Sequence, residues 1–202
     1  MVGRHPFSRK LPDVWLFSDE RIVADMRVLA AALPPGSGIV VRHDSLSARA
    51  RWRLFRRLAR TARARKLVLI LAAAPALARR WGADGVHLRQ AVSRRAGQAH
   101  RLGLAITMPV HNVREARAAR RAQAQGVFIS PLHPTRSHPG APALGRAAWL
   151  RLARLAGAQP VALGGMTPAR ACALKRSGGL NSGWAAIDAW EEKAAKRRRK
   201  PA

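Results

Sequence analysis

Five of the seven histidines lie in or just after short apolar segments, where an enzyme built on repeated strands would place its chemistry. They are His43, His87, His111, His133 and His138. Because imidazole exchanges protons near neutral pH, this set could include a general acid or base. His138 and His133 are the first candidates for a catalytic role, since they share a long loop punctuated by prolines, the kind of segment that carries function. The alternative for each histidine is an ordinary hydrogen-bonded polar residue.

The pair Gly164-Gly165 is a second chemical feature, because it follows the apolar run 160–163 and precedes a helical pattern. Glycines present their backbone N–H groups without side-chain obstruction, and the N-terminus of a following helix favours anions. The sequence therefore predicts a phosphate-binding loop here. The alternative is a tight exit from a strand that holds no ligand.

The elements that must position these groups recur at a steady interval. Most candidate strands are near-continuous apolar runs, typical of parallel strands covered on both faces, and the segments between them have helical spacing. Eight such units predict an α/β fold, a (β/α)8 TIM barrel in a single domain, in which the carboxyl ends of the strands meet at one mouth. The candidate strands are Val14–Ser18, Gly38–Arg42, Leu67–Ala72, Asp84–Leu88, Leu104–Met108, Gly126–Ser130, Pro160–Leu163 and Gly183–Ile187.

The helix boundaries agree with this series. Asn112 and Glu115 have the spacing of a capping box, and Thr167-Pro168 reads as an N-cap followed by proline at the first helical position, so we assign these residues structural roles. The segment 46–65 places its apolar residues along one side and most of its arginines elsewhere, which predicts a helix of the outer ring. A membrane-surface helix would show the same pattern, but the position between two strands favours the barrel.

The size and composition of the chain predict one domain. With 202 residues, of which 48% are hydrophobic, it can bury a single sizeable core. We divide it into a basic N-terminal extension (1–12), the barrel (13–191) and a basic C-terminal tail (192–202). No apolar run approaches the ~18 residues of a membrane span, so we expect no membrane contact and a cytoplasmic location. The single cysteine, Cys172, cannot form a disulfide within the chain, and we expect it to be buried.

The formal net charge of +28 raises nucleic acid as a partner. The arginines are scattered through nearly every helical segment, which resembles a compositional bias as much as a binding surface. The exception is the dense run 196–200 in the tail, which could contact RNA or anionic lipid. No zinc-ligand spacing, aromatic stacking motif or recognition helix accompanies the charge, so a nucleic-acid function is not favoured.

Three stretches resemble a known superfamily. They are Gly82 to Leu88 (Gly-Ala-Asp-Gly-Val-His-Leu), Pro134 to His138 (Pro-Thr-Arg-Ser-His) and Pro160 to Pro168, which includes Gly-Gly-Met-Thr-Pro. Together they are similar to the thiamine-phosphate synthase and thiazole tautomerase superfamily, of which the chain would be a divergent member. The resemblance covers most of the sequence. It implies a (β/α)8 barrel that acts on thiamine precursors.

The resemblance also implies roles for individual residues. Thr135, Ser137 and Gly165 would hold the phosphate of a thiazole phosphate, and Arg42 would face the pyrimidine diphosphate of a synthase. Adding the neighbouring Ser130 and Gly164 completes the predicted substrate site. That site comprises Arg42, Ser130, Thr135, Ser137, Gly164 and Gly165, with His138 and His133 as the catalytic candidates.

The chain departs from the synthase pattern at the magnesium and diphosphate end. The Asn-Asp pair after the third strand is replaced by Ala72-Ala73, and the second metal carboxylate by Ala91 or Val92. Because Mg²⁺ is held by one or two well-aimed carboxylates plus substrate phosphates, we predict no metal site and leave a magnesium requirement open. The remaining departures are Val40 and Asp44 around the strand-two arginine, His138 in place of a loop lysine, and Asp188 after the last strand.

These observations predict a barrel of thiamine biosynthesis or salvage that binds thiazole phosphate or thiamine phosphate. Its chemistry would be of the transferase or the tautomerase type. Tautomerase chemistry needs a proton carrier and no metal, although the histidine of that branch after strand six falls here at Pro131, two residues before His133. The alternative is a non-catalytic barrel that binds a phosphorylated ligand or a polyanion.

Overall fold

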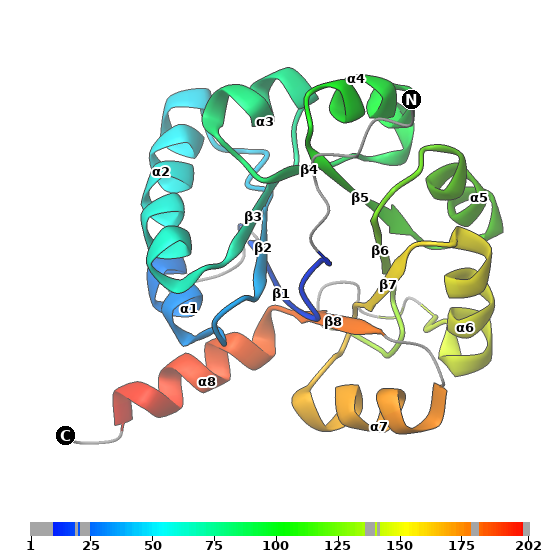
Figure 1. Cartoon of the computed structure of the whole chain (residues 1–202). Coiled ribbons are helices and arrows are strands. Elements are labelled where there is room, and N and C mark those ends of the chain that lie inside the picture. Colours follow the sequence, from blue (N-terminus) through cyan, green and yellow to red (C-terminus); the bar gives the residue numbers. More distant parts are fainter. Residues whose placement is uncertain are drawn as a thin grey trace.

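The eight apolar segments form eight strands, and each strand pairs in parallel with its sequence neighbours around a closed barrel (Figure 1). The computed structural model describes residues 10–18, 20, 25–135, 140, 142–178 and 182–199. The predicted (β/α)8 fold is confirmed, and the observed strand bounds differ from the predicted ones by at most two residues. The strands are β1 (Val14–Phe17), β2 (Gly38–Val41), β3 (Val68–Leu71), β4 (Gly85–His87), β5 (Ala105–Val110), β6 (Gly126–Ile129), β7 (Gln159–Ala162) and β8 (Gly183–Ala186).

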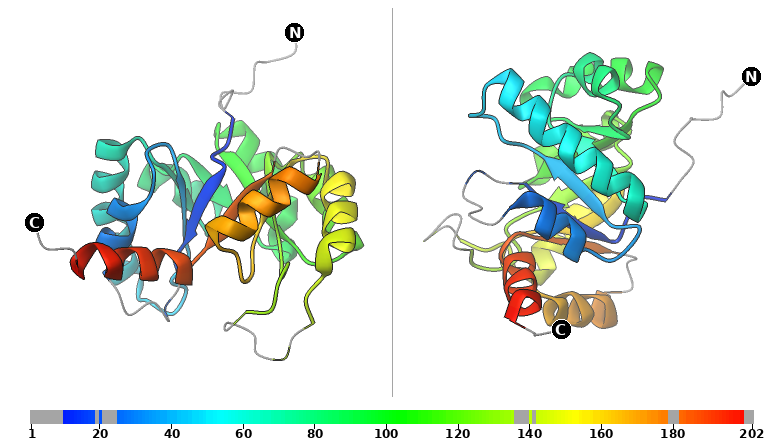
Figure 2. Two further views of the ribbon diagram at one scale, coloured as in Figure 1. Left: turned by 90° about the horizontal axis from the view of Figure 1, so that it is seen from below. Right: turned by 90° about the vertical axis from the view of Figure 1, so that its left-hand side faces the viewer.

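A ring of helices covers the outside of the barrel, and the side views in Figure 2 show the helices packed around the strands. Asn112 Oδ1 accepts the N–H of Glu115 (3.0 Å) and Thr167 Oγ1 accepts that of Arg170 (3.3 Å), so both predicted caps are present. The helices are α1 (Met26–Ala32), α2 (Ala48–Arg65), α3 (Pro75–Trp81), η1 (Gln90–Arg95, a 3-10 helix), α4 (Ala96–Arg101), α5 (Val113–Arg121), α6 (Gly145–Ala156), α7 (Pro168–Gly178) and α8 (Asp188–Arg199).

The amphipathic segment of the sequence is α2, which belongs to the outer ring. Phe55, Leu58 and Ala62 are its buried residues and join the core cluster between the helices and the strands. In the part of the chain that the structure describes, no helix combines the length and the apolar character needed to cross a membrane. Most of the residues of the expected tail, 192–199, continue α8, which projects away from the barrel (Figure 1).

Cys172 corrects an expectation, because it is exposed rather than buried. It lies on α7, whose buried side is formed by Ala171 and Leu174. The polar side of a helix can carry a single small apolar residue, so the general tendency of cysteine toward burial fails here.

The interior of the barrel is filled by aromatic and aliphatic side chains, and the three largest are aromatic. Trp15 and Phe17 of β1 contact Phe128 of β6 edge to face, at centroid distances of 5.3 and 4.6 Å. Trp15 is fully buried, and its indole N–H donates to the carbonyl of Pro12 (2.6 Å). Gly38 of β2 leaves the space for this indole, since a Cβ there would lie 2.2 Å from the ring. The packing of the core here therefore depends on the bulk of Trp15 and on the absence of a side chain at Gly38.

Replacing Gly38→Ala tests this packing. We expect the variant to lose about 1–3 kcal/mol of unfolding free energy, because an added methyl overpacks a filled core. Gly97→Ala in α4 is the control, since the nearest atom to its added Cβ is Arg101 Nη1 at 3.7 Å. That control should gain about 0.5–1 kcal/mol from its helical position. Urea denaturation of both variants measures the difference, and equal stabilities would contradict the packing argument.

Candidate functional site

The loops after β6 and β7 lie side by side at the mouth of the barrel. The N–H of Leu132 donates to the carbonyl of Leu163 (2.9 Å), and the N–H of His133 donates to that of Gly164 (3.2 Å). These bonds continue the β6–β7 ladder beyond the strand ends, so the segment 132–135 is held against the glycine pair. The structure thus brings together His133, Thr135, Gly164 and Gly165 of the predicted site, with Ser130 at the start of the same loop.

Both glycines are required by this contact. Gly164 has a φ of +91° and Gly165 a φ of +59°, conformations that glycine adopts readily. A Cβ on Gly164 would lie 2.8 Å from Pro131 Cα, and one on Gly165 would lie 2.5 Å from the Pro134 carbonyl oxygen. A tight strand exit therefore accounts for the glycine types, whether or not the loop also binds an anion.

The surroundings of the glycine pair suit an anion. The described residues provide no hydrogen-bond acceptor for the N–H groups of Gly164 and Gly165. The loop leads into the N-terminus of α7, where the helix dipole favours negative charge. Arg170, in the first turn of α7, reaches back to donate to the carbonyl of Gly165 and adds a full positive charge.

His133 is half-buried beside this loop. Burial, and to a smaller extent the positive charge of Arg170, lowers the pKa of His133 below its usual value. At neutral pH the ring is therefore largely neutral and able to accept a proton. The other two polar residues predicted on this loop, Ser137 and His138, lie outside the described residues.

Arg42 lies at the end of β2, three strands around the barrel from β7. Its N–H donates to Ser18 Oγ (2.9 Å), and the same oxygen lies 2.8 Å from Nδ1 of His43. Ser18 and His43 are buried, whereas Arg42 is exposed. The structure therefore leaves Arg42 at the mouth but does not place it beside the glycine pair.

His87 occupies the top of the aromatic core. Its ring meets Phe17 and Phe128 edge on, at 5.6 and 5.5 Å, and its Nδ1 lies 3.0 Å from Thr107 Oγ1. Burial, with the positive charges of Arg42, Arg89 and His111 adding to it, lowers the pKa of His87 to about 3. This histidine is neutral near pH 7 and is too weak a base to take up a proton there, so within the set of five it is a poor candidate for the acid or base.

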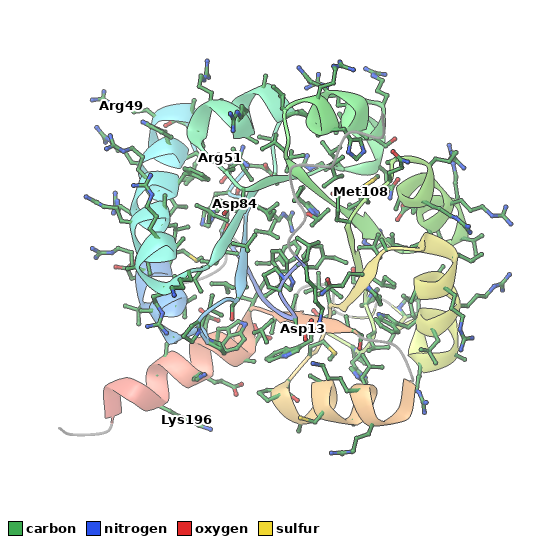
Figure 3. The ribbon with its side chains drawn as sticks, viewed as in Figure 1. Asp13, Arg49, Arg51, Asp84, Met108 and Lys196 are labelled. Carbon is green, nitrogen blue, oxygen red and sulfur yellow. The ribbon has the colours of Figure 1, made fainter. Side chains whose placement is uncertain are left out.

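An arginine and carboxylate cluster covers the mouth above β2, β3 and β4. Asp44 forms ion pairs with Arg89 and with Arg51, the latter at 3.5 Å. Arg51, on the barrel side of α2 (Figure 3), also donates to the carbonyl of Ala72 (2.7 Å). The sequence places Arg89 directly after the fourth strand, at the mouth, but it does not predict that Arg51 reaches the mouth. The position of Arg51 in the sequence could have indicated this contact, because the first turn of the helix after a barrel strand lies beside the carboxyl end of that strand.

The carboxylates of the mouth do not fit a magnesium ion. Asp44 is held by two guanidinium groups, Glu20 accepts the N–H of Ser45 (2.6 Å), and Asp188 opens α8, where an acid suits the helix dipole. Among the described residues, no group of three or more histidines, cysteines or acids is arranged to hold a metal. Two guanidinium groups around Asp44 oppose a dication at that carboxylate, so no step here is assigned to magnesium.

The fold and this mouth together define a (β/α)8 barrel with a glycine loop at the N-terminus of α7. A family model described as thiamine monophosphate synthase matches residues 15–189, and the chain belongs to that family.

Several solved structures have similar folds. Thiamine phosphate pyrophosphorylase from Pyrococcus furiosus superposes with a TM-score of 0.74 at 20% identity, covering 94% of this chain and 95% of that one. FabK from Thermotoga maritima gives 0.69 at 13% identity, over 89% of this chain and 59% of that one. The YdjI aldolase from Escherichia coli K12 gives 0.63 at 11%, over 95% and 83%. At these identities the likeness shows the fold alone. No curated protein sequence matches the chain.

The low pKa of His87 predicts a pH-dependent stability. The unfolded chain protonates this residue below about pH 6.5, whereas the folded chain does not until about pH 3. Its contribution to stability is therefore complete above pH 6.5 and falls with decreasing pH, by about 1.4 kcal/mol per unit between these values. Urea denaturation at pH 7, 6 and 5 should show this slope for the wild type and a slope smaller by that amount for His87→Gln. Parallel slopes would refute the assignment.

The second prediction for this site concerns the effect of the positive charge of Arg170 on the pKa of His133. Removing the charge with Arg170→Gln should raise the pKa of His133, because a nearby cation disfavours the imidazolium ion. Arg176→Gln, near the other end of α7, is the control and should leave that pKa unchanged. Histidine ring signals followed by NMR from pH 5 to 8 make the measurement. Equal titration of His133 in the two variants would remove Arg170 as a cause.

Proposed function

We propose that this barrel binds a phosphorylated thiazole, either thiazole phosphate or thiamine phosphate, with the phosphate at the Gly164-Gly165 loop. The observation that carries the proposal is the pair of glycine N–H groups without an acceptor among the described residues, next to Arg170 and the start of α7. Membership of the thiamine monophosphate synthase family supports a ligand of thiamine metabolism. We expect the hydroxyl groups of Ser130, Thr135 and Ser137 to complete the phosphate site.

The chemistry that the mouth favours is proton transfer rather than metal-assisted displacement of a diphosphate. A tautomerase moves one proton from a ring carbon of the thiazole to another position, which needs a base and an acid and no metal. His133, with its lowered pKa, is suited to accept that proton, and His138 is the partner that we propose to return one. Magnesium-dependent transfer has less support, because Asp44 is already paired with Arg51 and Arg89.

Arg42 is the residue that we propose as a second anion contact, on the other side of the mouth from the phosphate. It is exposed, and its charge reaches His87 in the floor of the mouth. A cytoplasmic location stays a prediction. If the proton carriers do not support turnover, the same site would serve as a phosphate-ligand binding site without catalysis.

A ligand titration tests the proposal. Thiazole phosphate should raise the melting temperature saturably, since a ligand of the folded state stabilises it by mass action. The dephosphorylated thiazole alcohol should bind at least tenfold more weakly, and Mg²⁺ should not alter either result. Gly165→Ala should weaken the phosphate ligand at least tenfold, because its Cβ would displace the Pro134 carbonyl at 2.5 Å.

The control is Gly157→Ala, which has a similar φ of +62° but no atom closer to its Cβ than Arg120 at 3.8 Å. It carries the same backbone strain outside the mouth, so its ligand affinity should equal that of the wild type. Equal affinities for phosphate and alcohol, or equal losses in the two glycine variants, would reject the site. Exchange of the ring proton in ²H₂O, followed by NMR, then separates a tautomerase from a binder.

A further inference from the structure

We propose that the outward face of α2 binds the phosphodiester backbone of a nucleic acid. The face is formed by exposed arginines and lies on the outside of the barrel, away from the mouth. Figure 3 shows Arg49 pointing outward from α2, whereas Arg51 points toward the strands. The exposed arginines of this face, called here the α2 arginine row, are Arg49, Arg53, Arg56, Arg57, Arg60 and Arg63.

The row has the geometry of a linear anion site. Its arginines recur three or four residues apart, the spacing that places side chains on one side of a helix. At 1.5 Å per residue, the distance from Arg49 to Arg63 is about 21 Å along the helix axis. One strand of a duplex carries a charge every 3.4 Å of axis, so about six phosphates span that length. The number of cations thus matches the number of phosphates along one strand.

A groove lies within the row. It has a volume of about 280 Å³ and is lined by Arg53, Arg56, Arg57 and Arg60. The guanidinium of Arg56 lies over the ring of Trp52, at 5.7 Å from its centroid, which restrains the side chain. Guanidinium groups bind phosphate oxygens through two parallel hydrogen bonds. The four arginines that line the groove thus each carry a group able to bind a phosphate.

In the part of the chain that the structure describes, little negative charge faces the row. The helix contains no acidic residue, and among the described residues its only ion pair is that of Arg51 with Asp44, on the barrel side. Asp25 interacts electrostatically with Arg57, but its carboxylate is held by Arg27, which donates one backbone and three side-chain hydrogen bonds to it. Like charges at this spacing repel one another along the helix. A bound polyanion relieves that repulsion.

The distribution of apolar residues favours nucleic acid over a membrane. A helix that binds a bilayer inserts an apolar face between the lipids. The apolar face of α2, with Phe55, Leu58 and Ala62, is already buried against the barrel. What remains for a partner is a row of guanidinium groups, which suits a regular array of phosphates.

Anisotropy of a fluorescent 20-bp DNA duplex tests the proposal with the full chain. The variant R53Q/R56Q/R57Q/R60Q removes the four cations of the groove. The control R114Q/R117Q/R120Q/R121Q removes four exposed arginines from α5, which contains Glu115 and lies on another side of the barrel (Figure 1). Both variants lose the same net charge. We expect the α2 variant to bind at least 30-fold more weakly at 150 mM salt, with a log–log salt slope smaller by about 3–4, and the α5 variant to change less than threefold.

Three results would overturn the proposal. They are equal losses in the two variants, absence of wild-type binding at 150 mM salt, and displacement of the DNA by polyglutamate or phosphatidylserine vesicles at the same charge concentration. Melting curves check the fold, and the α2 variant should melt no earlier than the wild type because it removes repulsion. If it melts early, Arg53→Gln and Arg60→Gln against Arg117→Gln give the same comparison with smaller effects.

Discussion

The candidate site depends on the hydrogen-bond ladder between β6 and β7, which continues past the ends of both strands. The pairing of Ile129 with Ala162 is followed by the bonds from Leu132 to Leu163 and from His133 to Gly164. Such close approach of two backbones is tolerated because Gly164 and Gly165 have no Cβ. A one-residue shift in this register would separate the histidine from the glycine N–H groups. The barrel fold determines the register of this ladder, and the ladder holds His133 beside the glycine pair.

Electrostatics divide the mouth into two halves. On the β6–β7 side, a helix N-terminus and Arg170 surround backbone donors, which is an arrangement for a monoanionic or dianionic group. On the β2–β4 side, guanidinium groups from Arg51 and Arg89 enclose Asp44. Asp44 therefore already serves two arginines, and Ala72-Ala73 follow the neighbouring strand β3 without any carboxylate. The β6–β7 half, in contrast, presents backbone N–H groups and does not depend on a carboxylate.

The sequence predicted the strands and caps well because these depend on local patterns. Continuous apolar runs are typical of parallel strands that are buried on both faces, and the oxygens of Asn112 and Thr167 reach N–H groups within their own turn. The contacts of Arg51, Arg89 and Arg170 could not be predicted, since a long side chain can turn in several directions and its partner is chosen by the tertiary fold. The burial of His87, and hence its neutral state, could have been predicted from the sequence. His87 stands two residues after Gly85 on one strand, so both face the same interior.

The total positive charge of the chain says less about its binding surfaces than the places where acidic residues balance that charge. Arg27 is paired with Asp25, and α5 contains Glu115 among its arginines, so these surfaces are partly balanced within the protein. The buried apolar residues of α2 pack against the barrel, and the helix contains no acidic residue. An external anion would therefore stabilise the arginines on its outer side. The two proposals therefore assign different kinds of anion recognition to the same scaffold. Backbone N–H groups and a helix end would act at the mouth, where shape limits the ligand, and flexible guanidinium groups would act on the outer surface, where length and charge density decide.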